Sequence, residues 1–474
     1  MRWTDLLRMS ISSLKRRKLR TFLTILGVVI GTASIVVMIS LGLGMQESVY
    51  REIEQSGGMT SLTVTGKQAG TGMIYSYSGG SEQEESQKYI TDDVISQLKQ
   101  IEHVKSVEPV LNVSAIALKG KYIGYLELKG MTPEGLQELK INLAPGGSLP
   151  SPGSGNLDLV VGNGVIQSFY EESTGKGYWD TGELPDIDFM NDQMFLILDQ
   201  EGYFQSQGNT ELGTGGQESN AAGTGSSTTK KIPKKYVVGA SGVVEGDVNS
   251  YNAHYYYVYC DLDTLKEMLK REFRGRVIPG QPSTKSGKPY SKFVYSSAMV
   301  QADDMDAVDT LSAQIREMGY NVSTNAEYME SMKKQFAMVQ AVLGGIGAVS
   351  LLVAAIGIAN TMMMSIYERT KEIGVMKVIG CSLKNIRQMF LLEAAFIGFI
   401  GGIIGNILSI LMSAVINFLT GNGSAIGLDG NISYIPPWLI LASLAFAVLV
   451  GMTSGYFPAL RAMRLSPLAA IRSE

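Results

Sequence analysis

Four long stretches without a charged residue constrain this chain of 474 residues more than any other feature of its sequence. They lie between Arg20 and Glu47, between Lys334 and Glu368, from Ala394 to Leu428 and from Gly430 to Leu460. A helix needs about 20 mainly apolar residues to cross a bilayer, and each stretch supplies that length. A single stretch could be a buried helix of a soluble protein. Four together, each flanked by basic residues, predict a membrane protein.

Basic residues indicate the orientation, because Lys and Arg are enriched in cytoplasmic segments. The net charge is +6 over residues 1–20, +3 over residues 367–388 and +2 over residues 458–474. The remainder therefore carries −15, and residues 419–436 contain no Lys or Arg. The first apolar stretch is too long for a signal peptide and no A-x-A site follows it, so it reads as an uncleaved anchor. We expect a multi-pass protein of the cell (cytoplasmic) membrane with both termini in the cytoplasm.

The expected fold class is an α-helical membrane protein with four transmembrane helices and a large extracytoplasmic mixed α/β domain inserted between helices 1 and 2. The expected transmembrane helices are residues 20–46, 335–367, 389–419 and 437–460. Residues 47–334 form the extracytoplasmic domain and residues 420–436 an extracytoplasmic loop. The cytoplasmic segments are an interfacial amphipathic helix at 1–19, a loop at 368–388 and a tail at 461–474.

Strand and helix patterns alternate near both ends of the extracytoplasmic segment. Lys292–Ala302 and Tyr320–Ser323 read as strands on either side of a helix that Asp303 and Asp304 open. Residues 91–93 cap an earlier helix, and an extended segment follows at Val104–Val113. We expect one α/β part built from both ends and a more β-rich lobe at about 110–290. The Gly- and Ser-rich stretches 66–87, 203–231 and 279–290 read as surface loops.

Residues that could carry chemistry are sparse. The chain has two His and two Cys, no metal-ligand spacing and no G-x-x-x-x-G-K-[ST] phosphate loop. Cys260 lies outside and Cys381 inside by the expected topology, so they cannot pair. Four tyrosines between residues 255 and 259 follow His254, either as a ligand or partner surface or as a two-faced core strand. We expect no catalytic site, no metal and no cofactor bound by this chain.

The sequence predicts a long, rod-like helix that begins after Thr324. Thr324 and Glu327 fit a capping box in front of a Pro-free run that reaches Ile366. A helix over those residues spans about 63 Å, twice the roughly 30 Å of a bilayer core. Much of it is expected to project outward as a stalk, and the first span could extend to about Gln55 to form a matching one. Such a rod can transmit displacement.

Small residues indicate helix contacts inside the membrane. Two GxxxG pairs occur, Gly27 with Gly31 in the first span and Gly401 with Gly405 in the third. Glu393 stands near the cytoplasmic end of the third span, where it is either functional or simply reaches the interface. The loop YERTKEIGVMKVIGCSLKNIRQ suggests a short basic helix, a turn at Gly380 and a second helix start at Ser382. It is either a tether or a docking element for a cytoplasmic partner.

Three sequence blocks resemble the MacB/FtsX-like permeases of ABC transporters. They are LKRRKLRTFLTILGVVIGTASIVVMISLGLG from Leu14, ERTKEIGVMKVIGCSLKNIRQMFLLEAAFIGFIGGIIG from Glu368, and GYFPALRAMRLSPLAAIRSE from Gly455. The order of one span, a large outside domain and three further spans also resembles that family. The middle of the outside domain matches only in size and position.

The resemblance implies a non-catalytic transmembrane subunit that forms a homodimer and works with a separate ABC ATPase, which binds ATP and Mg. It implies a coupling loop made by Arg369, Lys371, Glu372, Ile373, Gly374, Lys377, Gly380 and Ser382. It also implies mechanotransmission, in which ATP hydrolysis in the cytoplasm moves the outside domain, with a membrane-fusion-protein-like adaptor as a possible further partner. The expected function is export (efflux) of a drug, peptide or lipid-linked cargo. The alternatives are an FtsX-like regulator of an extracytoplasmic cell-wall hydrolase and a lipoprotein-extraction permease.

Overall fold

The computed structural model describes residues 18–66, 88–153, 155–207, 233–284, 287–421, 423 and 430–464. Most of the predicted amphipathic helix at 1–19 and most of the predicted loops at 66–87 and 203–231 lie outside these residues, as does most of the tail at 461–474. The chain divides into two compact units. The helical unit comprises Met1–Val49 and Ser331–Glu474, and the α/β unit comprises Tyr50–Glu330.

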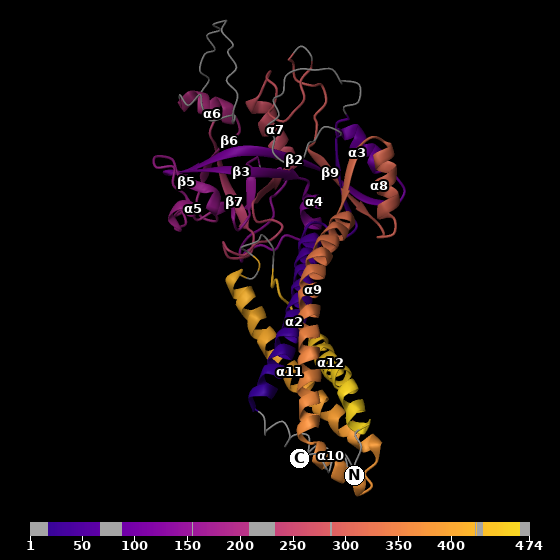
Figure 1. Cartoon of the computed structure of the whole chain (residues 1–474). Coiled ribbons are helices and arrows are strands. Elements are labelled where there is room, and N and C mark those ends of the chain that lie inside the picture. The colour runs from indigo at the N-terminus through magenta and orange to yellow at the C-terminus, as the bar shows by residue number, and fades with distance from the viewer. Residues whose placement is uncertain are drawn as a thin grey trace, which may run out of the picture. The chain divides into compact units, whose positions relative to one another are not determined.

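The helical unit contains long helices (Figure 1). Its described helices are α2 (Lys18–Gln55), α9 (Asn325–Glu368), α10 (Thr370–Val378), α11 (Leu383–Leu419) and α12 (Pro437–Arg464). Four of them, all except α10, are long and apolar enough to cross a membrane. The α/β unit is inserted between the first and second of these four, which confirms the predicted fold class.

Helices α2 and α9 each continue beyond the apolar residues that could span a bilayer. Helix α2 ends at Gln55, as predicted, and Gly57 follows with a positive φ of 99°. Helix α9 begins directly after Thr324, whose hydroxyl accepts a hydrogen bond from the Glu327 backbone N at 3.0 Å. The Glu327 carboxylate instead pairs with Arg316 at 2.8 Å, so only one half of the predicted capping box forms.

In its described residues the α/β unit contains ten strands and several short helices. Its strands are β1 (Ser61–Thr65), β2 (Val104–Lys119), β3 (Tyr122–Met131), β4 (Asp158–Val161), β5 (Phe169–Glu171), β6 (Met194–Ile197), β7 (Tyr236–Val243), β8 (Tyr257–Asp261), β9 (Ser297–Ala302) and β10 (Asn321–Thr324). Its helices are α3 (Asp92–Leu98), α4 (Pro133–Glu138), the 3₁₀ turn η2 (Val165–Ser168), α5 (Tyr178–Thr181), α6 (Gln200–Gln207), α7 (Leu262–Glu272) and α8 (Val308–Glu317).

Six of the strands close into a barrel. Hydrogen-bonded neighbours run in the order β2–β6–β7–β4–β8–β3, and β3 pairs with β2 again. The barrel is filled by alternate apolar residues of these strands, which belong to one buried cluster: Val113, Ala115, Ala117, Leu126, Leu128, Leu159, Val161, Met194, Leu196, Val238, Val258 and Cys260. Because side chains alternate between the faces of a strand, the residues between them face outward, as Tyr125 does with 43% of its surface exposed.

The long strand β2 joins this barrel to the part built from both ends of the insertion. Its first residues, 104–110, pair with β9, and residues 111–119 pair with β3. Strand β1 lies between β9 and β10. Helices α3 and α8 contribute Leu98 and Leu311 to the buried cluster beside these strands. The fold therefore contains the mixed α/β part that the sequence predicts at its two ends.

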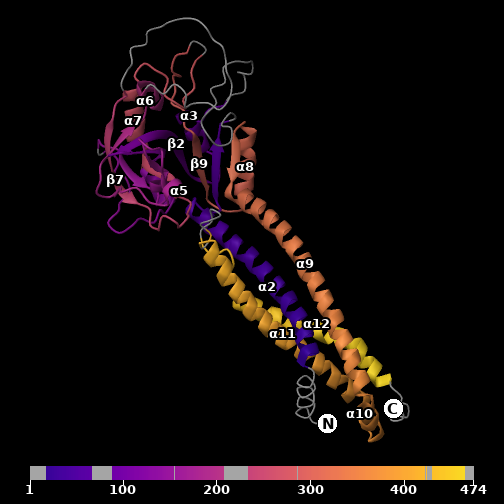
Figure 2. The same cartoon turned by 60° about the vertical axis from the view of Figure 1, so that its left-hand side comes forward.

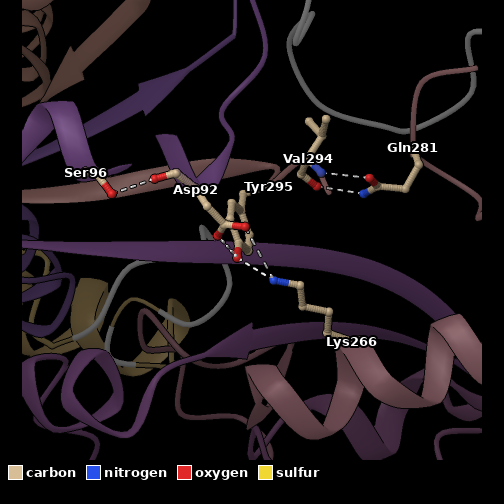
Figure 3. A network of polar contacts seen from close by, with 6 residues as sticks. All are labelled: Asp92, Ser96, Lys266, Gln281, Val294 and Tyr295. Atoms are coloured by element: carbon tan, nitrogen blue, oxygen red, sulfur yellow. Dashed lines mark hydrogen bonds and ion pairs between the residues drawn. The ribbon is translucent and has the colours of Figure 1, made fainter. Parts of the chain in front are cut away.

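Two predicted elements begin later than the sequence suggests. Helix α8 starts at Val308 because the backbone N of Asp303 bonds to the carbonyl of His103, and a turn precedes the helix. Strand β9 starts at Ser297, and ahead of it the side chain of Gln281 bonds to both backbone groups of Val294 (Figure 3). The Gln281 amide donates to the Val294 carbonyl at 2.7 Å, and its oxygen accepts from the Val294 N at 2.9 Å.

The same view shows a polar connection between α3 and α7 (Figure 3). The Tyr295 hydroxyl donates to an Asp92 carboxylate oxygen at 2.6 Å and accepts from the Lys266 ammonium at 2.8 Å. Lys266 also lies 4.9 Å from the centre of the Phe293 ring. These contacts link the barrel helix α7 to the part of the unit that contains α3.

Candidate functional site

The loop between α9 and α11 contains the short helix α10 and the predicted coupling residues. One residue, Arg369, separates α9 from α10 and is the N-cap of α10. Gly380 ends the turn after α10 with φ +89°, a conformation that residues with a Cβ rarely adopt. The Ser382 hydroxyl then accepts a hydrogen bond from the Lys384 backbone N at 3.3 Å and caps α11. The loop thus consists of the short helix α10, a turn at Gly380 and the capped start of α11.

One side of α10 is buried inside the helical unit. Ile373 is completely inaccessible and Gly374 is buried beside it. Ile373 belongs to a buried cluster with Ile386 and Phe390 of α11 and Ala459 of α12. Since α10 has only nine residues, this packing rather than intrinsic helix propensity holds it in place.

Polar contacts fasten both ends of α10. At its start the Arg369 guanidinium pairs with Glu372 at 2.9 Å and with the buried Glu393 of α11 at 3.8 Å. At its end the Lys377 ammonium donates to the carbonyl oxygen of Met463, in the last turn of α12, at 2.8 Å. A cation at a helix C-terminus is stabilised by the unpaired carbonyls there. Helix α10 is therefore fixed to α11 at one end and to α12 at the other.

The opposite side of α10 exposes apolar side chains. Val375, Val378 and Ile379 have 48%, 65% and 80% of their surfaces exposed. Residues three and four apart share one face of a helix, so these three side chains form a single patch, called here the α10 patch. Lys371 and Glu372 are exposed at the start of the same helix. An exposed apolar patch with a charged margin, on a firmly held helix, is suited to bind another protein.

The predicted coupling residues therefore fall into distinct structural roles. Ile373 and Gly374 are buried, Arg369 and Lys377 make the polar contacts, Lys371 and Glu372 lie beside the patch, and Gly380 and Ser382 form the turn and the cap. The sequence analysis missed the three patch residues. Their signal was present, because the segment IGVMKVI has apolar residues on every side of a short helix that can bury only one side.

The four predicted packing glycines lie where helices of the helical unit approach closely. A Cβ added at Gly27 would lie 3.3 Å from Cβ of Ala354, and one at Gly31 would lie 2.7 Å from Leu351, both on α9. A Cβ at Gly401 would lie 2.7 Å from Val28 of α2, and one at Gly405 would overlap the Thr32 hydroxyl. The first pair thus faces α9 and the second pair faces α2.

The tyrosine run after His254 is divided between the core and the surface. Tyr255 and Tyr259 are 6% and 2% exposed, whereas Tyr256 is 52% exposed. His254 is buried, and its Nδ1 lies 2.7 Å from the Tyr259 hydroxyl. Burial, together with the nearby charge of Lys129, lowers the pKa of His254 to about 4. In the described part of the chain no three His, Cys, Asp or Glu residues are grouped as metal ligands.

Two family models match different parts of the chain. The MacB-like periplasmic core domain matches residues 21–177, and the FtsX-like permease C-terminal domain matches residues 344–467. An uncharacterized ABC transporter permease of Methanocaldococcus jannaschii, MJ1507, is 24% identical over 100% of this chain and 99% of its own length. The uncharacterized ABC transporter permease YknZ of Bacillus subtilis is 24% identical over 99% of this chain and 98% of its own length.

Longer relatives and solved structures also match. The macrolide export ATP-binding/permease protein MacB of Syntrophobacter fumaroxidans is 24% identical over 98% of this chain, which spans 63% of that protein. The crystal structure of the extracellular domain of YknZ aligns with 56% of this chain at 12% identity and a TM-score of 0.28. The periplasmic region of MacB from Actinobacillus actinomycetemcomitans aligns with 59% of this chain at 13% identity and a TM-score of 0.30.

Together these findings define a class, the membrane permeases of ABC transporters. Within that class the chain resembles the MacB/FtsX-like permeases: the MacB-like model matches α2 and the first part of the inserted unit, and the FtsX-like model matches the C-terminal membrane helices from within α9 onward. It is a membrane protein with an extracytoplasmic domain.

Proposed function

We propose that this permease converts ATP hydrolysis by a separate ABC ATPase into movement of its extracytoplasmic unit. The chain itself carries out no catalysis and binds no cofactor in this scheme, and ATP and Mg belong to the partner. Its termini and the loop 368–388 face the cytoplasm of the cell that carries it, in agreement with the positive charge of these segments.

The observation that carries the proposal is the position of the α10 patch. Its three apolar side chains are exposed, while Ile373 on the other side is buried against α11 and α12 and Lys377 is tied to the end of α12. A protein that pushes on the patch therefore displaces α10, α11 and α12 together rather than unfolding a free loop. Helix α2 contacts this bundle through Val28 and Thr32, which lie against glycines of α11, and α9 contacts it through Ala354 of the buried cluster. These two continuous helices supply the route outward.

The partners and cargo follow from the same proposal. Two copies of the chain form the working permease, so that each α10 patch engages one ATPase subunit. We propose export of a drug, peptide or lipid-linked cargo that is handled by the extracytoplasmic unit, with an adaptor of the membrane-fusion-protein type. The name of the MacB relatives, macrolide export proteins, supports export as the direction of work. Regulation of a cell-wall hydrolase and extraction of lipoproteins are the alternatives that the experiment must separate.

The test reconstitutes the chain in nanodiscs with a candidate ABC ATPase of the same organism and compares the wild type with Ile379→Glu. Ile379 is 80% exposed, so the substitution should leave the fold intact while placing a charge in the ATPase contact. We expect loss of ATPase binding and of ATP turnover by the complex. Met305→Glu is the matched control, because Met305 is a 51% exposed apolar residue of the α/β unit.

Normal binding and turnover of Ile379→Glu would contradict the proposed contact. Co-purification then separates the functions. An adaptor of the membrane-fusion type recovered with the wild-type complex supports export, a cell-wall hydrolase supports regulation, and a bound lipoprotein supports extraction.

A further inference from the structure

The segment between α11 and α12 is buried in the helical unit at Ile432 and Ser433, which are 4% and 3% exposed. It has no regular secondary structure there, so its backbone groups need partners from elsewhere. Such partners are required most strictly near a bilayer, where water is not available to replace them. The contacts of Ser433 supply them from two directions.

Helix α11 holds the backbone of Ser433. The side-chain oxygen of Asn417 accepts a hydrogen bond from the Ser433 N at 3.0 Å, and the Asn417 amide donates to the Ser433 carbonyl at 2.9 Å. The Ser413 hydroxyl donates to the same carbonyl at 3.3 Å. Both backbone groups of Ser433 are thus satisfied by side chains from the last two turns of α11.

Helix α2 holds the other side of the same residue. The hydroxyl oxygens of Ser40 and Ser433 lie 2.8 Å apart, and the Tyr434 backbone N donates to the Ser40 carbonyl at 3.0 Å. One turn further along α2, Gly44 lies so close to the Ile432 backbone that an added Cβ would overlap it. The Ser433 segment therefore contacts both α2 and α11.

Helix α12 belongs to the same assembly. A Cβ added at Gly402 of α11 would lie 3.0 Å from Ala447, and Gly398 and Gly451 bring the α11 and α12 backbones into direct contact. Figures 1 and 2 show α11 and α12 running together in both views. Movement of this pair at the Ser433 level must therefore act on α2 at Ser40.

We propose that Ser433 is a clasp that makes α2 move with α11 and α12, and that Asn417 and Ser40 are its positioning residues. The clasp stays closed while the permease works. Helix α2 continues for 11 residues from Gly44 to Gln55, about 16 Å of rigid helix, so a displacement at the clasp is passed along α2. This inference rests on the proposed function for the source of the movement, but not for the existence of the clasp.

The structure offers two independent ways to alter the clasp. Asn417 contacts only backbone groups of Ser433, whereas Ser40 contacts its side chain. Two cysteines at residues 40 and 433 can therefore close a disulfide where the two hydroxyls now meet, without disturbing the contacts of Asn417. The background is Cys381→Ser, and the natural Cys260 stays because it is completely buried.

The first measurement uses the permease alone in nanodiscs with a mild oxidant. We expect Ser40→Cys/Ser433→Cys to form the disulfide in most molecules. The control pair Ser34→Cys/Ser433→Cys should not form it, because Ser34 lies six residues earlier, about 9 Å along α2, and bonds to the Ile30 carbonyl. Absence of the disulfide at residues 40 and 433, or equal yield in the control, overturns the clasp.

The second measurement adds the partner ATPase and records ATP turnover. We expect Asn417→Ala to lower turnover by about tenfold, the effect of losing one to two net hydrogen bonds from the closed arrangement. The disulfide should leave wild-type turnover unchanged and should restore the turnover of Asn417→Ala. A merely structural defect at Asn417 would not be rescued by a bond made elsewhere.

Two results overturn the proposal at this stage. One is turnover that stops on oxidation and returns on reduction, which means that the clasp must open. The other is an Asn417→Ala variant that stays inactive with the disulfide closed. If wild-type permease fails to engage any ATPase, the proposed function is wrong, and the disulfide yield of the first measurement still decides whether the clasp exists.

Discussion

The buried and exposed isoleucines of α10 allow a sharp test of how this helix is held. Ile373 is completely buried in a cluster with residues of α11 and α12, whereas Ile379, six residues later, is 80% exposed. Replacing a fully buried Ile by Ala removes its buried methyl groups and leaves a cavity, which destabilises a core by about 2–5 kcal/mol. The same replacement at Ile379 should alter the stability by no more than about 0.5 kcal/mol, because that side chain leaves water only when a partner binds.

Hydrogen exchange of the α10 amides measures this difference locally. A loss of ~2 kcal/mol raises the population of the locally opened helix, and hence the exchange rate, by about 30-fold. We expect that acceleration over 373–379 for Ile373→Ala and wild-type exchange for Ile379→Ala, with α12 unchanged in its middle turns. ATPase affinity should fall for both variants, but for different reasons. Equal protection in the two variants would refute the claim that packing rather than propensity fixes α10.

Three further predictions concern other contacts. Gly405→Ala should weaken packing of α11 against α2 by about 1–3 kcal/mol, read as a lower midpoint of thermal unfolding, whereas Gly357→Ala, with nothing within 4 Å, should not. Lys377→Met removes the charged group that donates to the Met463 carbonyl in the last turn of α12. The backbone amides of that turn should then exchange hydrogen faster, by the equivalent of about 1.5–3 kcal/mol in opening free energy, and unchanged protection would contradict the contact. His254 has a folded-state pKa of about 4, below the unfolded value of about 6.5, so the unfolded chain binds more protons between them. Unfolding free energy should therefore fall by up to ~3 kcal/mol as pH drops from 7 to 4, and His254→Gln should flatten that dependence.

Much of the membrane layout could be predicted from the sequence because hydrocarbon imposes simple rules. The length of the stretches without charged residues identified the four helices. The capping pattern at Thr324 marked the start of α9, and the glycines after Gln55 marked the end of α2. Each of these signals comes from residues that are close together in the sequence, so it does not depend on contacts with distant parts of the chain. The position of the inserted unit between the first two helices followed directly.

The barrel and the α10 patch could not be predicted in the same way. Closure of the barrel depends on β2 pairing with β3 along one edge and with β6 along the other, while the first residues of β2 pair with β9 outside the barrel, which no local pattern specifies. The segment before β9 is held at Val294 by Gln281, a side chain from a separate loop. For α10 the sequence identified the segment, but which apolar residues are buried is decided by α11 and α12.

One measurement tests the central claim, that ATP in the partner moves the extracytoplasmic unit through α10. A spin label placed at Met305→Cys, in the Cys381→Ser background, reports the distance between the two copies of the α/β unit in nanodiscs. We predict that this distance changes when ATP binds to the complex and that Ile379→Glu abolishes the change. A wild-type distance that ignores ATP, or a change that persists in Ile379→Glu, would contradict the account.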